Sequence, residues 1–83
     1  MKADERDCLA KIMLAELSQA GPLRRRELHK RIIRRCATPA TFVNILNYLK
    51  RHKYIEKTSA KHTAPYRITE KGRKWLEILL EEP

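Results

Sequence analysis

The stretch that decides the fold is residues 38–72, which read TPATFVNILNYLKRHKYIEKTSAKHTAPYRITEKG. It opens with Thr38-Pro39, a pair typical of a helix start, because a threonine hydroxyl caps exposed N–H groups and proline fits the first helical position. Apolar residues then recur at the three-and-four spacing of one buried helical stripe: Phe42, Ile45, Leu46 and Leu49. We therefore predict a helix from about residue 38 to residue 52.

Two short segments rich in β-branched and aromatic residues follow this helix, at residues 54–58 and 65–68. They flank a small, polar and basic loop, which is the pattern of a β-hairpin. We expect Tyr54 and Tyr66 to form a cross-strand pair in this hairpin.

Two further helices are predicted before this stretch. The first covers residues 4–20, where apolar residues recur at helical spacing, and Gly21-Pro22 ends it because glycine fits the left-handed stop and proline cannot continue a helix. The second covers residues 25–35. Leu23, between the two helices, is expected to form a very short strand.

The last predicted helix covers residues 70–81, and Thr69 is placed to cap its N-terminus. The order of elements is thus helix, helix, helix, hairpin, helix, a mainly α fold with a small β-hairpin. A chain of 83 residues suffices for one modest core, so we expect a single domain over residues 1–83.

The net charge of +9 is distributed unevenly along the chain. Residues 1–20 carry 3 basic and 4 acidic side chains, residues 21–68 carry 13 basic and 2 acidic ones, and residues 69–83 carry 3 basic and 4 acidic ones. The excess of positive charge therefore lies wholly in the middle. A solvated surface usually mixes both signs, whereas a surface for a polyanion requires such segregation.

Several classes of protein are excluded by what the sequence does not contain. No apolar run approaches the roughly 18 residues of a membrane span, and the polar, acidic start differs from a signal peptide. We therefore expect a soluble, intracellular, cytoplasmic protein. No Gly-rich phosphate loop and no nucleophile–histidine arrangement is visible, so we expect neither enzymatic activity nor a cofactor.

The two cysteines, Cys8 and Cys36, lie 28 positions apart. Neither a CxxC motif nor the Cys/His spacing of a zinc finger occurs, so we expect no metal site. Small buried cysteines are the simplest interpretation. A Cys8–Cys36 disulfide, or a Cys8–Cys8 bond between subunits, stays open as an alternative.

Three segments together resemble the winged-helix DNA-binding family, most of all small MarR- or PadR-like regulators of archaea and their viruses. Residues 26–32, RELHKRI, resemble the first helix of the helix-turn-helix. Residues 42–55 resemble the recognition helix running into the first wing strand. Residues 66–72, YRITEKG, are similar to the Tyr-x-Leu-Thr-x-x-Gly that closes the wing in many of these proteins.

Two departures from the family pattern stand out. From Leu28 to Phe42 the chain is about three residues longer than a compact helix-turn-helix, so residues 34–37 are expected to form an extended turn. Lys53 occupies a place where the family often has glycine, and lysine takes a left-handed conformation only at some cost in free energy.

The resemblance implies that the third helix enters the major groove of duplex DNA and that the wing lies beside or in the minor groove. Candidate base contacts are Thr41, Asn44, Asn47 and Tyr48; asparagine matches the donor and acceptor of adenine. For Tyr48, a phosphate contact and packing beneath the wing are equally open. Candidate contacts of the wing and of the second and third helices with the DNA backbone are Arg24, Arg25, Arg26, Arg31, Lys50, Arg51, Lys57, Lys61, His62 and Arg67.

The two terminal helices, residues 4–20 and 70–81, are apolar on more than one face, and a second subunit is the simplest cover. Candidate dimer contacts are Leu9, Met13, Trp75, Leu76, Leu79 and Leu80. We expect a sequence-specific transcription regulator that binds double-stranded DNA as a homodimer. We expect it to bind neither a membrane nor a small-molecule effector. The alternatives are a winged helix that binds an acidic protein, and a non-specific architectural nucleic-acid-binding protein.

Overall fold

The computed structural model describes residues 3–33 and 39–81, with side chains from residue 6 onward. Its elements are α1 (Ala3–Ala20), α2 (Arg25–Ile32), α3 (Pro39–Arg51), β1 (Ile55–Lys57), β2 (Tyr66–Ile68) and α4 (Glu70–Glu81). The fold is mainly helical with a small two-stranded hairpin, and the predicted order of elements is confirmed. The predicted Thr38 cap and the extended turn of residues 34–37 lie outside the described residues.

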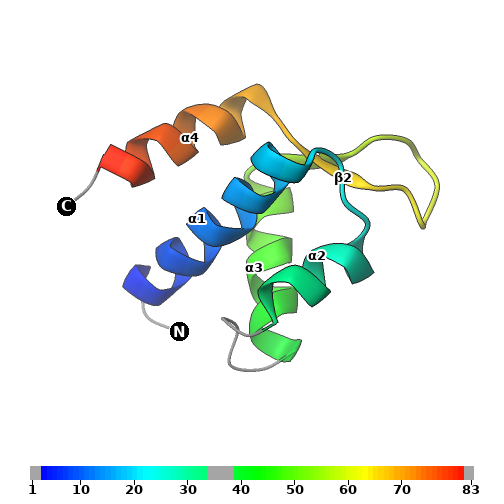
Figure 1. Ribbon diagram of the computed structural model, residues 1–83, viewed down its shortest axis with the longest axis horizontal. Helices are drawn as coiled ribbons and strands as arrows, with labels where there is room; N and C mark the ends of the chain where they lie inside the picture. The colour runs from blue at the N-terminus through cyan, green and yellow to red at the C-terminus, as the bar shows by residue number, and fades with distance from the viewer. Residues whose placement is uncertain (1–2, 34–38, 82–83) are drawn as a thin grey trace.

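Helix α1 is the centre of the packing. Figure 1 shows α1 between α4 on one side and α2 and α3 on the other, while the loop of the hairpin projects beyond the helices. The core is formed by apolar side chains from every element, including Ala10, Met13, Leu14, Leu17, Leu28, Ile32, Phe42, Ile45, Leu46, Leu49, Ile55, Tyr66, Ile68 and Leu76. Because α1 meets helices on two sides, both of its apolar faces are used within one chain.

This packing corrects part of the expected dimer surface. Met13 is 0% exposed, Leu76 7% and Leu79 6% in the single chain. These three side chains are buried within the single chain, so they have almost no surface left for a partner. Only Leu80, at 62% exposed, and the half-buried Leu9 and Trp75 remain available from the expected set.

The strands β1 and β2 pair antiparallel, with Ile55 opposite Ile68 and Lys57 opposite Tyr66. The expected pairing of Tyr54 with Tyr66 is therefore wrong. Tyr66 also pairs with the segment before α2: its N–H donates to the Leu23 carbonyl at 2.8 Å and its carbonyl accepts the Leu23 N–H at 3.0 Å. Leu23 thus forms the one-residue bridge that the sequence predicted, and it holds β2 against the start of α2.

Helix α3 ends in a Schellman motif at Lys53, whose φ of 61° is the left-handed value expected for this position. The Lys53 N–H donates to the Lys50 carbonyl at 3.1 Å, and the Tyr54 N–H donates to the Leu49 carbonyl at 2.9 Å. These two bonds satisfy carbonyl groups that the end of the helix would otherwise leave open. They also turn the chain sharply from α3 into β1.

Thr69 binds this turn to the start of α4. Its hydroxyl donates to the Lys53 carbonyl at 2.7 Å and accepts the Gly72 N–H at 3.0 Å, and its own N–H donates to the Tyr54 carbonyl at 3.0 Å. The predicted N-cap is confirmed, and the same side chain also anchors the end of α3. We name residues Lys53, Tyr54, Thr69 and Gly72 the α3–α4 corner.

Gly72 allows the backbones of the corner to approach this closely. A Cβ at this position would overlap the Tyr54 carbonyl oxygen and would lie 2.9 Å from Ile68 Cγ1. The first atom belongs to the backbone and cannot move aside without displacing the turn. Any larger residue therefore separates α4 from the end of α3.

We expect Gly72→Ala to lower the free energy of unfolding by about 1–3 kcal/mol, the usual cost of forcing extra atoms into a packed site. Urea unfolding followed by circular dichroism measures it. Lys53→Gly, in the same corner, is the opposite control and should raise stability by about 1 kcal/mol, because glycine adopts a positive φ without strain. An unchanged urea midpoint for Gly72→Ala would show that the corner is not tightly packed.

Candidate nucleic-acid interface

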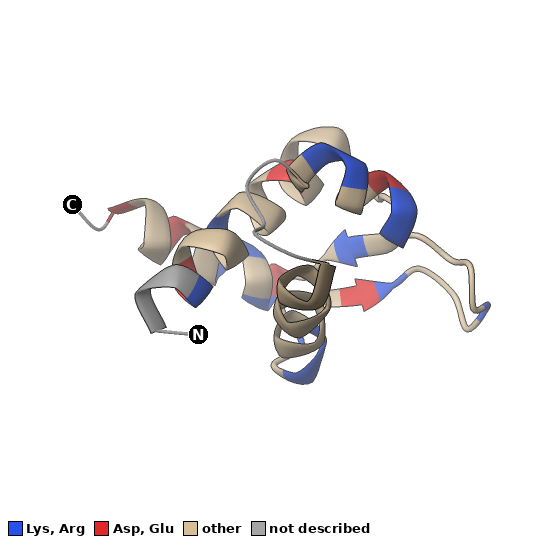
Figure 2. Cartoon of the chain, turned by 90° about the horizontal axis from the view of Figure 1, so that it is seen from below, with Lys and Arg blue, Asp and Glu red and all other residues tan. Residues whose placement is uncertain are grey.

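Lys and Arg lie along α2, at the C-terminal end of α3 and on the hairpin (Figure 2). Within the described residues, these cations have no carboxylate within 4.0 Å: Arg24, Arg25, Arg26, Lys30, Lys50, Arg51, Lys53, Lys57 and Lys61. We call this set the basic face. Since uncompensated cations repel one another, such a face gains free energy when a polyanion covers it.

Two of the expected backbone contacts are neutralised in this structure. Arg31 pairs with Glu16 of α1 at 3.4 Å, and Arg67 donates to Glu56 on the neighbouring strand at 2.8 Å. Both pairs are exposed, so each contributes little to stability. They nevertheless offset the charge of these arginines and place them at the edge of the basic face.

Helix α3 presents a polar strip at the centre of the basic face. Asn44 and Asn47 are exposed, as is Arg51 one turn further on, and the buried stripe of α3 lies on the opposite side of the helix. Thr41 is half-buried beside them. The two amides can each donate and accept a hydrogen bond, which is the property that reading a base edge requires.

Tyr48 lies in a different environment from the two asparagines. Its ring lies 6.0 Å from that of Trp75 on α4 and 4.5 Å from that of His52, and the Arg6 guanidinium of α1 lies 4.6 Å from its centre. The ring packs against side chains of α1 and α4 and not beneath the wing, which is the packing that the sequence left open. Tyr48 therefore lies on the flank of α3 that faces α1 and α4.

The opposite flank of α3 meets the hairpin through two lysines. Lys50 Nζ lies 5.7 Å and Lys57 Nζ 5.8 Å from the centre of the Tyr66 ring. Both distances fall within the range of a cation–π attraction, which holds two like charges near one aromatic ring. Positive charge is therefore continuous from α3 to β1.

The loop between β1 and β2 carries Lys61 near its tip. The Lys61 N–H donates to Ser59 Oγ at 3.3 Å, and its carbonyl accepts the Ala64 N–H at 3.1 Å. At the base of the loop, Lys57 Nζ donates to the His62 carbonyl at 3.3 Å. These bonds hold the loop in a defined turn and leave the Lys61 and His62 side chains exposed.

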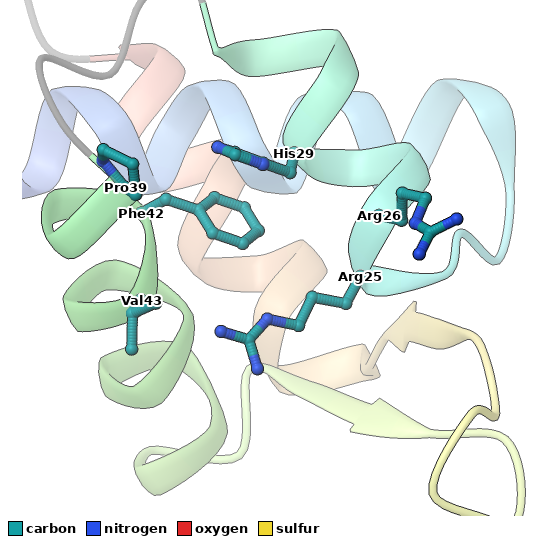
Figure 3. Close-up of a pocket in the computed structure, with 6 residues that line it drawn as sticks. All are labelled: Arg25, Arg26, His29, Pro39, Phe42 and Val43. Carbon is teal, nitrogen blue, oxygen red and sulfur yellow. The ribbon is translucent and has the colours of Figure 1, made fainter.

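A hollow of about 370 Å³ separates α2 from α3. It is lined by Arg25, Arg26, His29, Pro39, Phe42 and Val43 (Figure 3). The sequence alone predicts no role for His29. A signal was present, because Arg25 and His29 are four residues apart and thus share one face of a helix, but nothing in the sequence places that face against α3.

Helix α4 carries exposed apolar side chains beside Lys71 and Arg73, two exposed cations that also have no carboxylate within 4.0 Å in the described residues. Ile78 is 55% and Leu80 62% exposed on α4, and Cys8 of α1 is an exposed free thiol. Cys36, the other half of the disulfide considered above, lies outside the described residues.

No protein-family model, no curated protein and no solved structure matches this chain. Within the described ranges, no helix is long and apolar enough to cross a membrane. In those same ranges, no three metal-ligating side chains lie close enough to hold an ion.

The aromatic cluster behind α3 contains the one tyrosine with a displaced pKa among the described groups. Tyr54 stacks on Trp75 with 4.3 Å between ring centres. Burial raises the pKa of Tyr54, and the nearby Tyr48 and Asp7 raise it further. The folded protein therefore holds this phenolic proton more tightly than the unfolded chain does.

It follows that Tyr54 contributes stability that is complete below its ordinary pKa near 10 and is lost as pH rises through the higher folded value. We expect Tyr54→Phe to retain more of its pH 8 stability at pH 11 than the wild type retains. Urea unfolding at pH 8, 9, 10 and 11 measures the difference. Parallel curves for the two proteins would contradict this assignment.

Proposed function

We propose that this chain is a winged-helix protein that binds double-stranded DNA in a sequence-specific manner and regulates transcription. Helix α3 is the recognition helix and enters the major groove. The loop between β1 and β2 is the wing and lies on the backbone or in the minor groove. The observation that carries the proposal is the basic face together with the exposed amides of Asn44 and Asn47 on α3.

The shape of the molecule supports this proposal. A helix about 10–12 Å wide fits the major groove, provided that one side of it is free of protein. The side of α3 with Asn44 and Asn47 is exposed over its length, while α1 and α2 pack against the rest. The projecting loop with Lys61 can reach the backbone beyond the groove (Figure 1).

The contacts divide into two kinds. Asn44 and Asn47 carry hydrogen-bonding groups that differ between base pairs, so they select sequence. Arg24, Arg26, Arg51 and Lys61 carry point charges or forks for phosphates, so they supply affinity and position without reading sequence. Tyr48 is assigned to the support of α3 instead of to base reading, because its ring packs against α1 and α4.

The alternatives account less well for the exposed amides. The basic face would attract an acidic protein partner, but such a partner does not explain the two exposed asparagines on α3. A non-specific binder of single strands needs exposed aromatic rings for base stacking. Of the described aromatic residues, Tyr48, Tyr54 and Trp75 stack among themselves and are half-buried.

We further propose that the protein acts as a homodimer on a pseudo-palindromic site. The supporting observation is that Ile78 and Leu80 are exposed on α4, away from the basic face. The expected interface is thereby reduced to the outer surface of α4 and α1, with Leu9, Trp75 and Leu80 from the original set. A pairing there leaves both recognition helices free.

Salt dependence tests the phosphate contacts and the dimer together. If one subunit neutralises about five phosphates, log affinity should fall with log salt at a slope of about −9 for a dimer and about −4.5 for a monomer. Fluorescence anisotropy with a duplex selected from a random pool, between 50 and 300 mM salt, measures the slope. Affinity that barely changes with salt would reject the DNA-binding proposal.

Two alanine variants separate base reading from phosphate binding. Asn44→Ala should weaken the selected duplex by about 1–3 kcal/mol and leave random DNA unchanged, because it removes only a base contact. Lys61→Ala should weaken both duplexes alike and reduce the salt slope by about 1 per contact. Lys74→Ala is the matched control, since Lys74 lies on α4 and pairs with Glu70 at 3.8 Å. Equal losses on both duplexes for Asn44→Ala would remove it from base reading.

A further inference from the structure

The hollow between α2 and α3 contains a polar atom without a partner. His29 Nε2 is shielded from solvent and makes no hydrogen bond in the described structure. The ring is held in place by Phe42, with 4.7 Å between the ring centres. A buried nitrogen of this kind is costly when unpaired, so the site has an unsatisfied need for a hydrogen-bonding group.

The charge around the hollow determines which group satisfies it. Figure 3 shows the Arg25 guanidinium extending from α2 toward α3 near Val43, below the rings of His29 and Phe42, while Arg26 points to the other side. Among the described residues that line the hollow, the charged ones are Arg25 and Arg26, and none is acidic. Arg25 has no ion-pair partner in the described structure. When Nε2 carries its proton, the group that satisfies both His29 and Arg25 is an anionic acceptor.

The position of the hollow narrows the choice of anion. It opens beside Val43, which neighbours Asn44 on α3, and it is bounded by the first turn of α2. An anion seated there lies at the edge of the strip that we assign to the major groove. Phosphate oxygens combine the charge and the acceptor geometry that a guanidinium fork and an imidazole N–H recognise.

We propose that this hollow is a phosphate-binding site in which Arg25 and His29 together hold one backbone phosphate of the bound nucleic acid. That the phosphate belongs to a nucleic acid rests on the proposed function. That the hollow binds a phosphate rests on the geometry of α2 and α3. Nε2 is shielded in the free protein, so binding requires a small shift of the imidazole that brings Nε2 to the hollow. His29 then donates from Nε2 to one phosphate oxygen, and Arg25 contributes its charge and further N–H donors. The ring contact with Phe42 supports the imidazole.

This site gives His29 a role different from that of the exposed cations of the basic face. An exposed lysine or arginine follows a phosphate wherever the backbone lies. A half-buried imidazole fixed against Phe42 accepts a phosphate at one place only, so it sets how α3 is positioned along the groove. One particular phosphate of the duplex should therefore matter much more than its neighbours.

The experiment uses duplexes in which single phosphates are replaced by uncharged methylphosphonates. We expect one position per half-site at which this change weakens wild-type binding by about tenfold, the worth of one charge-assisted hydrogen bond. His29→Leu keeps an apolar side chain against Phe42 but no donor, and it should lose the dependence on that phosphate. His29→Gln retains a donor and should keep most of it. Lys61→Ala, which removes a cation elsewhere, should keep it fully.

Two outcomes overturn the site. If His29→Leu remains as sensitive as the wild type at every methylphosphonate position, His29 holds no backbone phosphate. If His29→Leu loses affinity equally for all duplexes and its melting temperature by circular dichroism is also lowered, His29 is a structural residue. The test then uses His29→Gln, provided that its melting temperature is unchanged, because this variant reports on binding without a loss of fold.

A second arm of the experiment works without DNA and distinguishes failure of the site from failure of the proposed function. Histidine ring signals of the protein are followed by NMR while inorganic phosphate or dimethyl phosphate is added at constant ionic strength, with chloride as the reference salt. Saturable shifts of the His29 ring that vanish in Arg25→Gln support the site even if no duplex is bound. A different result would overturn the assignment to a nucleic-acid phosphate. If inorganic phosphate saturates the site but His29→Leu responds to the methylphosphonate duplexes as the wild type does, the hollow binds free phosphate.

Discussion

The structure depends on one side chain that bonds in two directions, the hydroxyl of Thr69. It donates to the Lys53 carbonyl at the end of α3 and accepts the Gly72 N–H at the start of α4. A hydroxyl can do both at once because it has one proton and two lone pairs. Since the hairpin leaves from this corner and returns to it, the positions of α3, the hairpin and α4 are all set by the same few bonds. Gly72 is the condition for them, because any Cβ would separate the two helices.

The corner also explains how the basic face acquires its shape. The left-handed turn at Lys53 turns the chain from α3 into β1, and β1 places Lys57 near Lys50 at the ring of Tyr66. Tyr66 is itself fixed by the Leu23 bridge, which lies directly before the arginines of α2. Cations from three separate parts of the sequence therefore meet on one side through backbone bonds instead of through ion pairs.

The order of elements, the Thr69 cap and the left-handed Lys53 could be predicted from the sequence because each depends on neighbouring residues. A cap needs only its own helix, and a Schellman turn needs only the six residues that form it. The pairing of Tyr54 with Tyr66 could not be predicted correctly, because the Thr69 N–H donates to the Tyr54 carbonyl and so places Tyr54 at Thr69 and Lys57 at Tyr66.

The site was predictable to a similar degree. Exposed cations and amides followed from charge and helical spacing, whereas their pairing did not: Glu16 meets Arg31 across 15 positions. The role of His29 was missed for the same reason, since the hollow exists only when α2 is placed against α3. Burial of Met13 in the chain's own core was likewise hidden, because apolar spacing shows that a face will be covered but not by which helix.

The few acidic residues near the basic face offset positive charge at its margins only. Glu16 holds Arg31 and Glu56 holds Arg67, and both pairs lie at the margins, on α1 and on the outer side of the hairpin. Glu27, the one acid of α2, accepts the backbone N–H of Arg24 at 3.4 Å and so serves the start of the helix. Between these margins the described cations remain uncompensated, which costs folding free energy through mutual repulsion. The fold accepts this cost at the basic face and pairs charges at its margins. The electrostatic free energy of such a surface is lowered most by a regular array of negative charges, such as a phosphate backbone.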